Sequence, residues 1–226
     1  MNLGIESTTE ASRITVCERF ENLAERFCSF AEGHGYTIVP THNNYKKFRS
    51  LPHEVQKLIL HTFEIYYGVL ISVHSQGRDL ADSRSTTWAA IRELGLVPPS
   101  DLFEYLEEND IFEIYSPEHI QIFRSLNFFP LTSYSLEDVF SYSWDELYSR
   151  SEVITKDMYE LGTKVMKGEI RGVTKGNFPR HAVIAKFSPG KETTLIQHKL
   201  FAPLRSTDHE IFAFNAFNVV DGKEPK

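Results

Sequence analysis

Residues 181–220, HAVIAKFSPGKETTLIQHKLFAPLRSTDHEIFAFNAFNVV, are rich in β-branched and aromatic side chains and are interrupted twice by turn-forming residues. The turns are SPGK at 188–191 and STD at 206–208, and the runs that they separate are 181–187, 193–201 and 210–220. Short apolar runs joined by Ser, Pro, Gly and Asp are typical of antiparallel strands. The sequence therefore predicts three antiparallel strands in the last third of the chain.

The last of these runs is apolar on both of its faces. Because side chains alternate along a strand, one face carries Ile211, Ala213, Asn215, Phe217 and Val219, and the other carries Phe212, Phe214, Ala216, Asn218 and Val220. A strand with two apolar faces is covered on both sides. We expect the N-terminal helices to cover one of these faces, in cis or from a second subunit.

The preceding residues, 110–180, combine two short strands with helices. The runs 111–115 and 120–126 are separated by the turn SPEH, as in a hairpin. Helices are expected at 135–140, 144–149 and 155–167. From residue 110 onward the predicted order is therefore two strands, three helices and three strands.

This order, together with several short motifs, resembles the PAS sensor domain over about residues 110–221. IFEIY at 111–115 and IQIF at 120–123 are similar to the first two strands of that family, and Asn127-Phe128-Phe129 is similar to the start of its first short helix. LTSYSLED at 131–138 is similar to the family's LTGYS turn, with Ser133 where glycine is usual. Trp144 and Leu147 match an aromatic residue and a leucine of the pattern, and the fourth strand ends in APL at 202–204.

The resemblance implies both a fold and a kind of function. The fold is a five-stranded antiparallel sheet with short helices around an internal hydrophobic pocket, so that the whole chain is α+β. The function is sensing, in which a molecule bound in the pocket shifts the sheet and alters the packing on its outer face.

The N-terminal half carries no comparable resemblance and is predicted to be helical. Residues 1–12 are polar and expected to fray, and apolar periodicity predicts helices at 15–32, 51–73, 85–94 and 101–107. The second of these helices is apolar on all sides, which is typical of a helix at the centre of a domain or in a dimer interface. We therefore expect a helical packing and dimerisation region at 1–109, a PAS-like domain at 110–222 and a tail at 223–226.

The composition excludes several classes of partner and location. With 24 basic and 31 acidic residues the formal charge is −7, so nucleic acid is not an expected partner, because phosphate binding needs clustered positive charge. The longest nearly apolar stretch, 65–73, is far shorter than the roughly 20 residues of a membrane helix, and the segment after Met1 shows no secretory signal. Cys17 and Cys28 lie about 16 Å apart on one predicted helix, too far for a disulfide. We expect a cytoplasmic protein with reduced thiols.

No cofactor or metal is expected either. Flavin-binding light sensors of the family use a cysteine of the domain, and both cysteines of this chain lie outside it, which excludes flavin–thiol photochemistry. Haem-binding versions place a histidine on the long helix, and 155–167 has none, so His181 and His198 are the remaining candidates for an iron ligand. The nine histidines show no metal-ligand spacing; His53 and His61, for example, are about 12 Å apart on one helix.

Eight residues are candidates for the pocket lining: Asn127, Phe128, Tyr134, Trp144, Tyr159, His181, His198 and Asn215. The aromatic candidates are first of all core side chains, and as a lining they would favour a flat or apolar ligand. Asn127 is expected to hold a turn by bonding backbone. Alternation places His198 on one face with Thr194, Ile196, Leu200 and Ala202. We favour a hydrogen-bonded core histidine over a ligand-contacting one that titrates near neutrality.

The preferred interpretation is a cytoplasmic, homodimeric sensory or regulatory module that binds a small apolar or aromatic ligand, or a partner protein. It signals through its sheet face and N-terminal helices to a separate output protein and is not an enzyme. One alternative is the ligand-sensing part of a transcription regulator, although KKFR at 46–49 is the only basic cluster. Another is an enzyme that uses His198, His181 or Glu160 as acid or base, although the sequence shows no paired carboxylates or nucleophile–base spacing.

Overall fold

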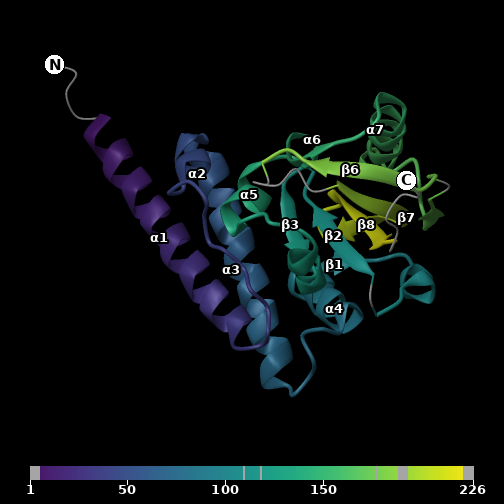
Figure 1. Cartoon of the computed structure of the whole chain (residues 1–226), viewed down its shortest axis with the longest axis horizontal. Coiled ribbons are helices and arrows are strands. Elements are labelled where there is room, and N and C mark those ends of the chain that lie inside the picture. The colour runs from purple at the N-terminus through teal and green to yellow at the C-terminus, as the bar shows by residue number, and fades with distance from the viewer. Residues whose placement is uncertain (1–5, 109, 118, 177, 188–192, 221–226) are drawn as a thin grey trace.

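The computed structural model describes residues 6–108, 110–117, 119–176, 178–187 and 193–220, and shows a helical half beside a curled sheet (Figure 1). The first half holds the helices α1 (Glu6–Glu32), α2 (Lys46–Ser50), α3 (His53–Ser75) and α4 (Ser83–Glu93), the short strand β1 (Leu96–Val97) and the 3-10 helix η1 (Leu102–Tyr105). The second half holds β2 (Ile111–Tyr115), β3 (Gln121–Arg124), the 3-10 helix η2 (Leu126–Leu131), α5 (Leu136–Ser141), α6 (Trp144–Leu147), β4 (Tyr148–Ser149), α7 (Glu152–Met166), β5 (Thr174–Lys175), β6 (His181–Ala185), β7 (Thr193–Ser206) and β8 (Ile211–Val219).

The strands form one antiparallel sheet in the order β3-β2-β8-β7-β6-β4. The last strand, β8, therefore lies in the middle, with the β2–β3 hairpin on one side and β7 on the other. The long strand β7 also pairs with the short strands β1 and β5. The predicted α+β fold, with a five-stranded antiparallel sheet and short helices in the C-terminal half, is confirmed, and β1, β4 and β5 extend that sheet.

The helix α3 lies at the centre of the molecule, between α1 and the sheet edge (Figure 1). Aromatic rings fill both of its sides: the ring of Phe63 lies 5.3 Å from that of Phe27 on α1 and 4.7 Å from that of Phe140 on α5. The ring of Tyr66 lies 5.3 Å from that of Phe123 on the edge strand β3. The central position explains why the sequence of α3 is apolar on nearly every side.

The outer face of the sheet is covered by the N-terminal helices of the same chain. Phe112 of β2 and Phe214 of β8 are fully buried, and their rings stack at 5.9 Å. They belong to the same hydrophobic core as α1, α3 and α4, and α4 contacts β2 and β3 directly. The sequence left open whether this face is covered by the N-terminal helices of the same chain or of a second subunit, and in the structure the helices of the same chain cover it.

Several boundaries differ from the prediction, and capping side chains explain two of them. Asp82 accepts a hydrogen bond from the backbone N of Ser85 (3.0 Å), so α4 begins at Ser83. Ser151 caps α7 in the same way, so that helix begins at Glu152. The predicted fraying is wrong for residues 6–12, because α1 begins at Glu6.

Three other elements also differ from the expected ranges. The expected helix at 101–107 is the shorter 3-10 helix η1, and the helix expected at 144–149 gives way to β4 after Leu147. The strand expected at 120–126 ends at Arg124, where η2 follows. Residues 1–5, the turn at 188–191 and the tail at 223–226 lie outside the described residues.

Candidate functional site

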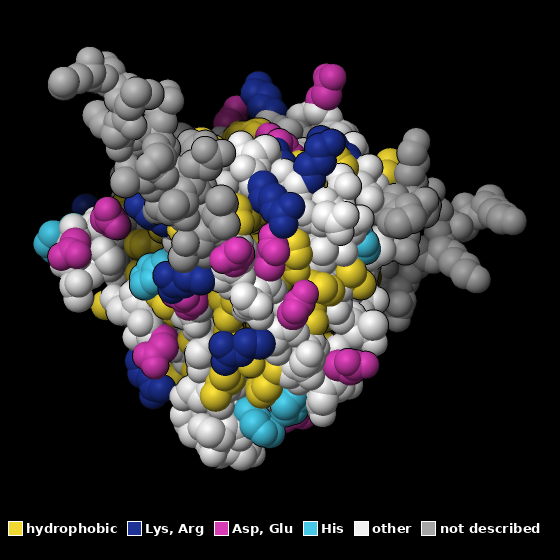
Figure 2. Space-filling model, turned by 90° about the vertical axis from the view of Figure 1, so that its left-hand side faces the viewer, with side chains coloured by type: hydrophobic (Ala, Val, Ile, Leu, Met, Phe, Trp, Pro, Cys, Tyr) yellow, Lys and Arg dark blue, Asp and Glu magenta, His cyan; other side chains and the backbone are white. Residues whose placement is uncertain are grey.

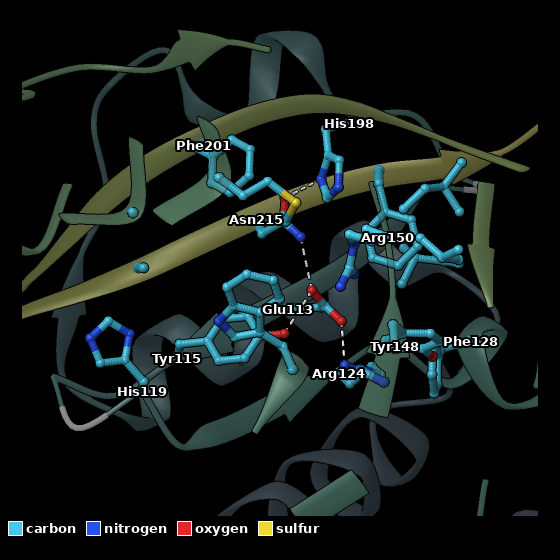
Figure 3. A pocket seen from close by; sticks show the side chains of 18 of the residues that line it. Glu113, Tyr115, His119, Arg124, Phe128, Tyr148, Arg150, His198, Phe201 and Asn215 are labelled. Carbon is cyan, nitrogen blue, oxygen red and sulfur yellow. Dashed lines mark hydrogen bonds and ion pairs between the residues drawn. The ribbon is translucent and has the colours of Figure 1, made fainter. Parts of the chain in front are cut away.

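A cavity of about 90 Å³ lies between the inner face of the sheet and α7 (Figure 3). Its walls come from β2, β3, β6, β7 and β8, from η2, from α7 and from the residues between Trp144 and Arg150. Most of the lining is apolar or aromatic, as at Met158, Phe201 and Phe217. Polar side chains converge at one part of it, and this combination is typical of a pocket for a small ligand.

A buried ion pair joins Glu113 of β2 to Arg124 of β3, and both side chains line the cavity. The exposed fractions of the two side chains are only 7% and 2%. The other carboxylate oxygen of Glu113 accepts hydrogen bonds from the hydroxyl of Tyr115 (3.0 Å) and from the amide nitrogen of Asn215 (2.8 Å). The Arg124 guanidinium also lies 3.7 Å above the ring of Phe128. These contacts compensate the negative charge of Glu113, as a buried carboxylate requires.

His198 extends this network across the cavity wall, as the dashed lines in Figure 3 show. Its Nδ1 lies 3.0 Å from the side-chain oxygen of Asn215. Because the amide nitrogen of Asn215 donates to Glu113, that oxygen is the acceptor, and His198 donates from Nδ1. The Nε2 atom of the neutral ring then carries a lone pair, and it has no partner among the described residues.

The environment of His198 keeps its ring neutral. Burial lowers its pKa to about 3, and the nearby Arg150 and His181 act in the same direction, while the hydrogen bond to Asn215 opposes them. The favoured prediction of a buried, hydrogen-bonded histidine matches this geometry. The alternative of a group that titrates near neutrality does not.

Arg150 places a second guanidinium in the cavity, directly between β4 and α7. It lies 5.1 Å from the ring of Trp144 and 5.2 Å from that of Tyr148. Its Nε and Nη1 atoms are buried, and in the described part of the chain they have no hydrogen-bond partner. Burial lowers the pKa of this guanidinium, which Tyr115 and Glu113 partly offset. Glu113 therefore acts on Arg150 through the cavity, but among the residues described no carboxylate forms an ion pair with Arg150.

The structure brings five of the eight predicted pocket residues into the lining: Phe128, Trp144, Tyr159, His198 and Asn215. Asn127 lies beside it and holds a turn: its amide nitrogen donates to the backbone oxygen of Asp110 (3.1 Å), and its oxygen accepts from Ser125 (2.7 Å). Tyr134 donates to the backbone oxygen of Leu147. His181 stacks on His198 at 5.5 Å without being part of the lining.

A bulge in β7 changes which residues share a face with His198. The register shifts between His198 and Leu200, so that Lys199 is an extra residue on that strand. His198 and Phe201 consequently face the cavity, while Leu200 pairs with Ala216 on the outer face. The predicted common face of His198, Leu200 and Ala202 is therefore wrong.

Gly176 is fitted closely to this bulge. Its backbone N donates to the oxygen of Lys199 (2.8 Å), and a Cβ at this position would lie 3.1 Å from the backbone oxygen of His198. Because glycine has no side chain, the loop before β6 can pack directly against the backbone of the bulged strand at His198 and Lys199. This contact helps to hold His198 in place.

The sequence interpretation missed the charged residues Glu113, Arg124 and Arg150. A signal was present for the first two, because each lies inside a strand-like apolar run, in IFEIY and in QIFRSL. Their pairing depends on a second irregularity, since the β2–β3 register shifts between Ile114 and Tyr115 and thereby places Arg124 opposite Glu113. Arg150 follows no comparable pattern.

The roof of the cavity packs less extensively than the rest of the molecule. α7 buries Ile154, Met158 and Val165 in a small cluster with Phe201 and Ala213, separate from the main core. The lining residues Tyr159 and Thr163 on α7 are exposed, as is His119 in the loop before β3. The cavity therefore reaches solvent along one side of α7.

Potential metal ligands do not cluster in the residues that the structure describes. No group of three or more His, Cys, Asp or Glu side chains converges in those residues. His34 and His74 form a pair, with Nε2 of the first 3.0 Å from Nδ1 of the second. Of the described helices, none has the length and apolar character needed to cross a bilayer.

Comparisons with known proteins give matches only among solved structures. No protein-family model matches the chain, and no curated protein matches it. A tryptophan-to-alanine variant of the Drosophila melanogaster Cycle PAS-B domain with bound glycerol aligns with a TM-score of 0.38 and 16% identity. The wild-type domain with bound ethylene glycol aligns with a TM-score of 0.38 and 13% identity. Each alignment covers 49% of this chain and 99% of the other.

The C-terminal half has the order of strands and helices that the sequence predicted, with the first two strands beside the last one in the sheet. This half of the chain therefore has the antiparallel sheet with short helices that the resemblance to the PAS domain implied.

Proposed function

We propose that this protein is a sensory module that binds a small molecule in the cavity between the sheet and α7. The observation that carries the proposal is the convergence of buried polar atoms without partners, on Arg150 and His198, in an otherwise apolar cavity. Buried polar groups normally have hydrogen-bond partners. A bound molecule would supply the partners that the described residues do not.

The size of the cavity restricts the ligand. An apolar cavity of about 150 Å³ can hold benzene, and this one measures about 90 Å³. The ligand, or the part of it that enters, is therefore small. A larger molecule would require α7 to move outward, and the separate cluster beneath that helix would allow such a movement at little cost to the main core.

The network around the cavity offers a route to the N-terminal helices. Tyr66 of α3 donates a hydrogen bond to the backbone oxygen of Arg124 (2.5 Å), and the side chain of Arg124 is paired with Glu113 in the cavity wall. Occupation of the cavity would bias the position of β3 relative to α3. Because these helices already cover the outer face of the sheet, the signal would leave through the helices themselves.

The alternative functions receive less support from the geometry. An enzyme would need a base, and the three groups that the sequence offered do not suit that role. His198 has a pKa of about 3, burial lowers the pKa of His181, and Glu160 is exposed and outside the cavity lining. The carboxylate in the cavity, Glu113, already accepts from three donors. A DNA-binding role for 46–49 is not favoured, since Lys47 pairs with Glu146 (3.3 Å) and Arg49 with Glu21 (2.5 Å). Figure 2 shows described basic side chains interspersed with acidic ones on the face formed by α1.

The remaining parts of the proposal concern partners and location. We place the protein in the cytoplasm, without a cofactor, as a homodimer that acts on a separate output protein. Native mass spectrometry of the purified protein measures the oligomeric state and any retained small molecule together. A monomer at micromolar concentration would contradict the dimer.

The ligand site is tested by NMR titration of the ¹⁵N-labelled full chain with small alcohols, amides, carboxylates and phenols. We expect at least one class to shift the amide signals of Thr194, Asn215 and Phe217, which line the cavity. Gly162→Leu should abolish these shifts, because Gly162 lines the cavity on α7 and a Cβ there meets no atom within 4 Å.

The matched control is Gly68→Leu, at an exposed helical glycine of α3 that also has open space around it. It should leave the binding unchanged. Shifts that persist in Gly162→Leu, or an absence of shifts with every compound, would refute the proposed ligand site.

A further inference from the structure

The cavity lining carries more positive than negative charge. Its charged side chains are the guanidinium groups of Arg124 and Arg150 and the carboxylate of Glu113, and His198 is neutral. One carboxylate against two guanidinium groups leaves one uncompensated positive charge. His119, at the rim, is exposed to solvent.

The uncompensated charge belongs to Arg150. Glu113 is already paired with Arg124 and accepts from Tyr115 and Asn215 as well. Arg150, by contrast, forms no ion pair with a described carboxylate. Its buried Nε and Nη1 have no acceptor among the described residues, and the same is true of the Nε and Nη1 of Arg124, which has its ion pair through Nη2. Its contacts with Trp144 and Tyr148 engage only the ring faces. A buried cation in this state is costly unless an anion joins it.

We infer that the ligand of this cavity is a small monocarboxylate whose carboxylate pairs with Arg150; this inference rests on the proposed function. The planar guanidinium presents its N–H groups as a fork that matches the two oxygens of a carboxylate. One negative charge balances the one excess positive charge. A dianion such as phosphate would place a surplus negative charge in a mostly apolar space, so the carboxylate is the better match.

The rest of the cavity defines the remainder of the ligand. Met158, Phe201 and Phe217 supply apolar walls, and the volume of about 90 Å³ leaves room for a short hydrocarbon body only. Arg150 stands directly before Ser151, whose side chain caps the first turn of α7. A carboxylate on Arg150 would therefore act at the point where α7 begins, and so on the helix that roofs the cavity.

The test uses three probes of similar size and different charge: propionate, propionamide and propylammonium. Binding to the full-length protein is followed at pH 7 by the amide signals of Thr194, Asn215 and Phe217. We expect propionate to bind at least about tenfold more tightly than propionamide, as the loss of a charged hydrogen-bonding partner implies. Propylammonium should produce no shifts. Equal binding of propionate and propionamide would overturn the inference.

Variants of Arg150 identify the group responsible. Arg150→Gln should weaken propionate binding by at least about tenfold and remove its preference over propionamide. Arg150→Met, which keeps an unbranched apolar side chain but removes the guanidinium, should do the same. It serves as a second variant in case Arg150→Gln alone disturbs the fold. Arg171→Gln removes one positive charge from an exposed position and should leave binding unchanged.

The outcomes separate this inference from the proposed function. If propionate and propionamide bind equally, and only Gly162→Leu abolishes their shifts, the charge requirement is wrong while the ligand cavity stands. If none of the three probes binds, the carboxylate inference is wrong, and the wider titration decides the proposed function independently. Propionate binding that Arg150→Gln and Arg150→Met leave intact also refutes the inference.

Discussion

The hydroxyl of Tyr66 donates a hydrogen bond to the backbone oxygen of Arg124 at 2.5 Å, across 58 residues of sequence. Tyr66 lies on α3, in the helical half, and Arg124 is the last residue of the edge strand β3. The same arginine extends its side chain to the Glu113 carboxylate in the cavity wall. One residue thus connects the central helix to the candidate ligand site.

Tyr66→Phe should lower the free energy of unfolding by about 1–3 kcal/mol, because it leaves a buried carbonyl without its donor. Urea denaturation followed by circular dichroism measures the change. Tyr67→Phe, on the same helix but only partly buried, should change the stability by less than about 0.5 kcal/mol. An equal effect of the two substitutions would contradict the assigned role of the Tyr66 hydroxyl.

Arg124→Met should destabilise the protein by about 3–5 kcal/mol, because it leaves the Glu113 carboxylate buried without its cation. Adding Glu113→Gln to this variant should restore part of the loss, since the neutral amide no longer needs a counter-charge. Chemical denaturation of the wild type, both single variants and the double variant gives the coupling energy. Additive effects of the two substitutions would show that the pair is not energetically coupled.

The stability should fall as the pH drops below the ordinary pKa of histidine, because of His198. The pKa of His198 is about 3 in the folded protein and about 6.5 in the unfolded chain. Between these two values the imidazole is protonated in the unfolded chain and neutral in the folded protein. The contribution of the neutral His198 to the free energy of unfolding is fully present above the unfolded pKa and is lost as the pH falls. Between pH 7.5 and 5 the free energy of unfolding should decrease by about 2 kcal/mol.

The measurement is urea denaturation of the wild type and of His198→Gln over this pH range. The variant should show a shallower decline, since the proton uptake at this position is gone. His61→Gln, at an exposed site on α3, is the control and should follow the wild type. His181, whose pKa is also lowered by burial, is present in both proteins, so it adds the same pH dependence of stability to each of them.

Lactate should bind more tightly than propionate, if the carboxylate inference is correct, because its hydroxyl can donate to the lone pair on Nε2 of His198. The expected gain is about 1 kcal/mol, or roughly fivefold in Kd. Isothermal titration calorimetry at pH 7 measures it. His198→Phe should abolish the difference between the two acids, and a difference that survives would place the hydroxyl elsewhere.

Glu137 is another buried carboxylate, and its hydrogen bonds connect α5 to the helical half of the chain. It accepts hydrogen bonds from the backbone N of Lys47 (2.7 Å) and of Phe48 (3.1 Å), and from the hydroxyl of Thr41 (2.6 Å). Glu137→Gln should cost about 1.5–3 kcal/mol of stability in thermal or urea unfolding. Glu160→Gln, at an exposed site, should cost less than about 0.5 kcal/mol, and similar losses for both would contradict this role.

Much of the fold follows from local patterns in the sequence. The two apolar faces of 210–220 predicted that this strand would be covered on both sides, and β8 is covered by the N-terminal helices on one side and faces the cavity on the other. The apolar surface of the helix after Leu51 predicted either a central position or a dimer interface, and α3 lies at the centre of the molecule (Figure 1). These predictions succeed because periodicity and turn residues act within a few positions of the chain.

The candidate site was less accessible to the same reasoning. Phe128, Trp144, Tyr159, His198 and Asn215 reach the cavity as the sequence interpretation proposed. Arg150 was missed, because a charged residue between two short elements has no periodic context that reveals where its side chain goes. Only the packing of α7 over the sheet encloses it.

The sequence by itself determined most of the longer helices and strands and which of them are apolar on more than one face, since those properties depend on neighbouring residues. The tertiary structure decided which polar groups meet. A shift between Ile114 and Tyr115 sets Arg124 opposite Glu113, and another at Lys199 turns Phe201 instead of Leu200 toward the cavity. The physical reason is that one extra residue in a strand exchanges its two faces, and the choice of that residue depends on how distant segments pack together.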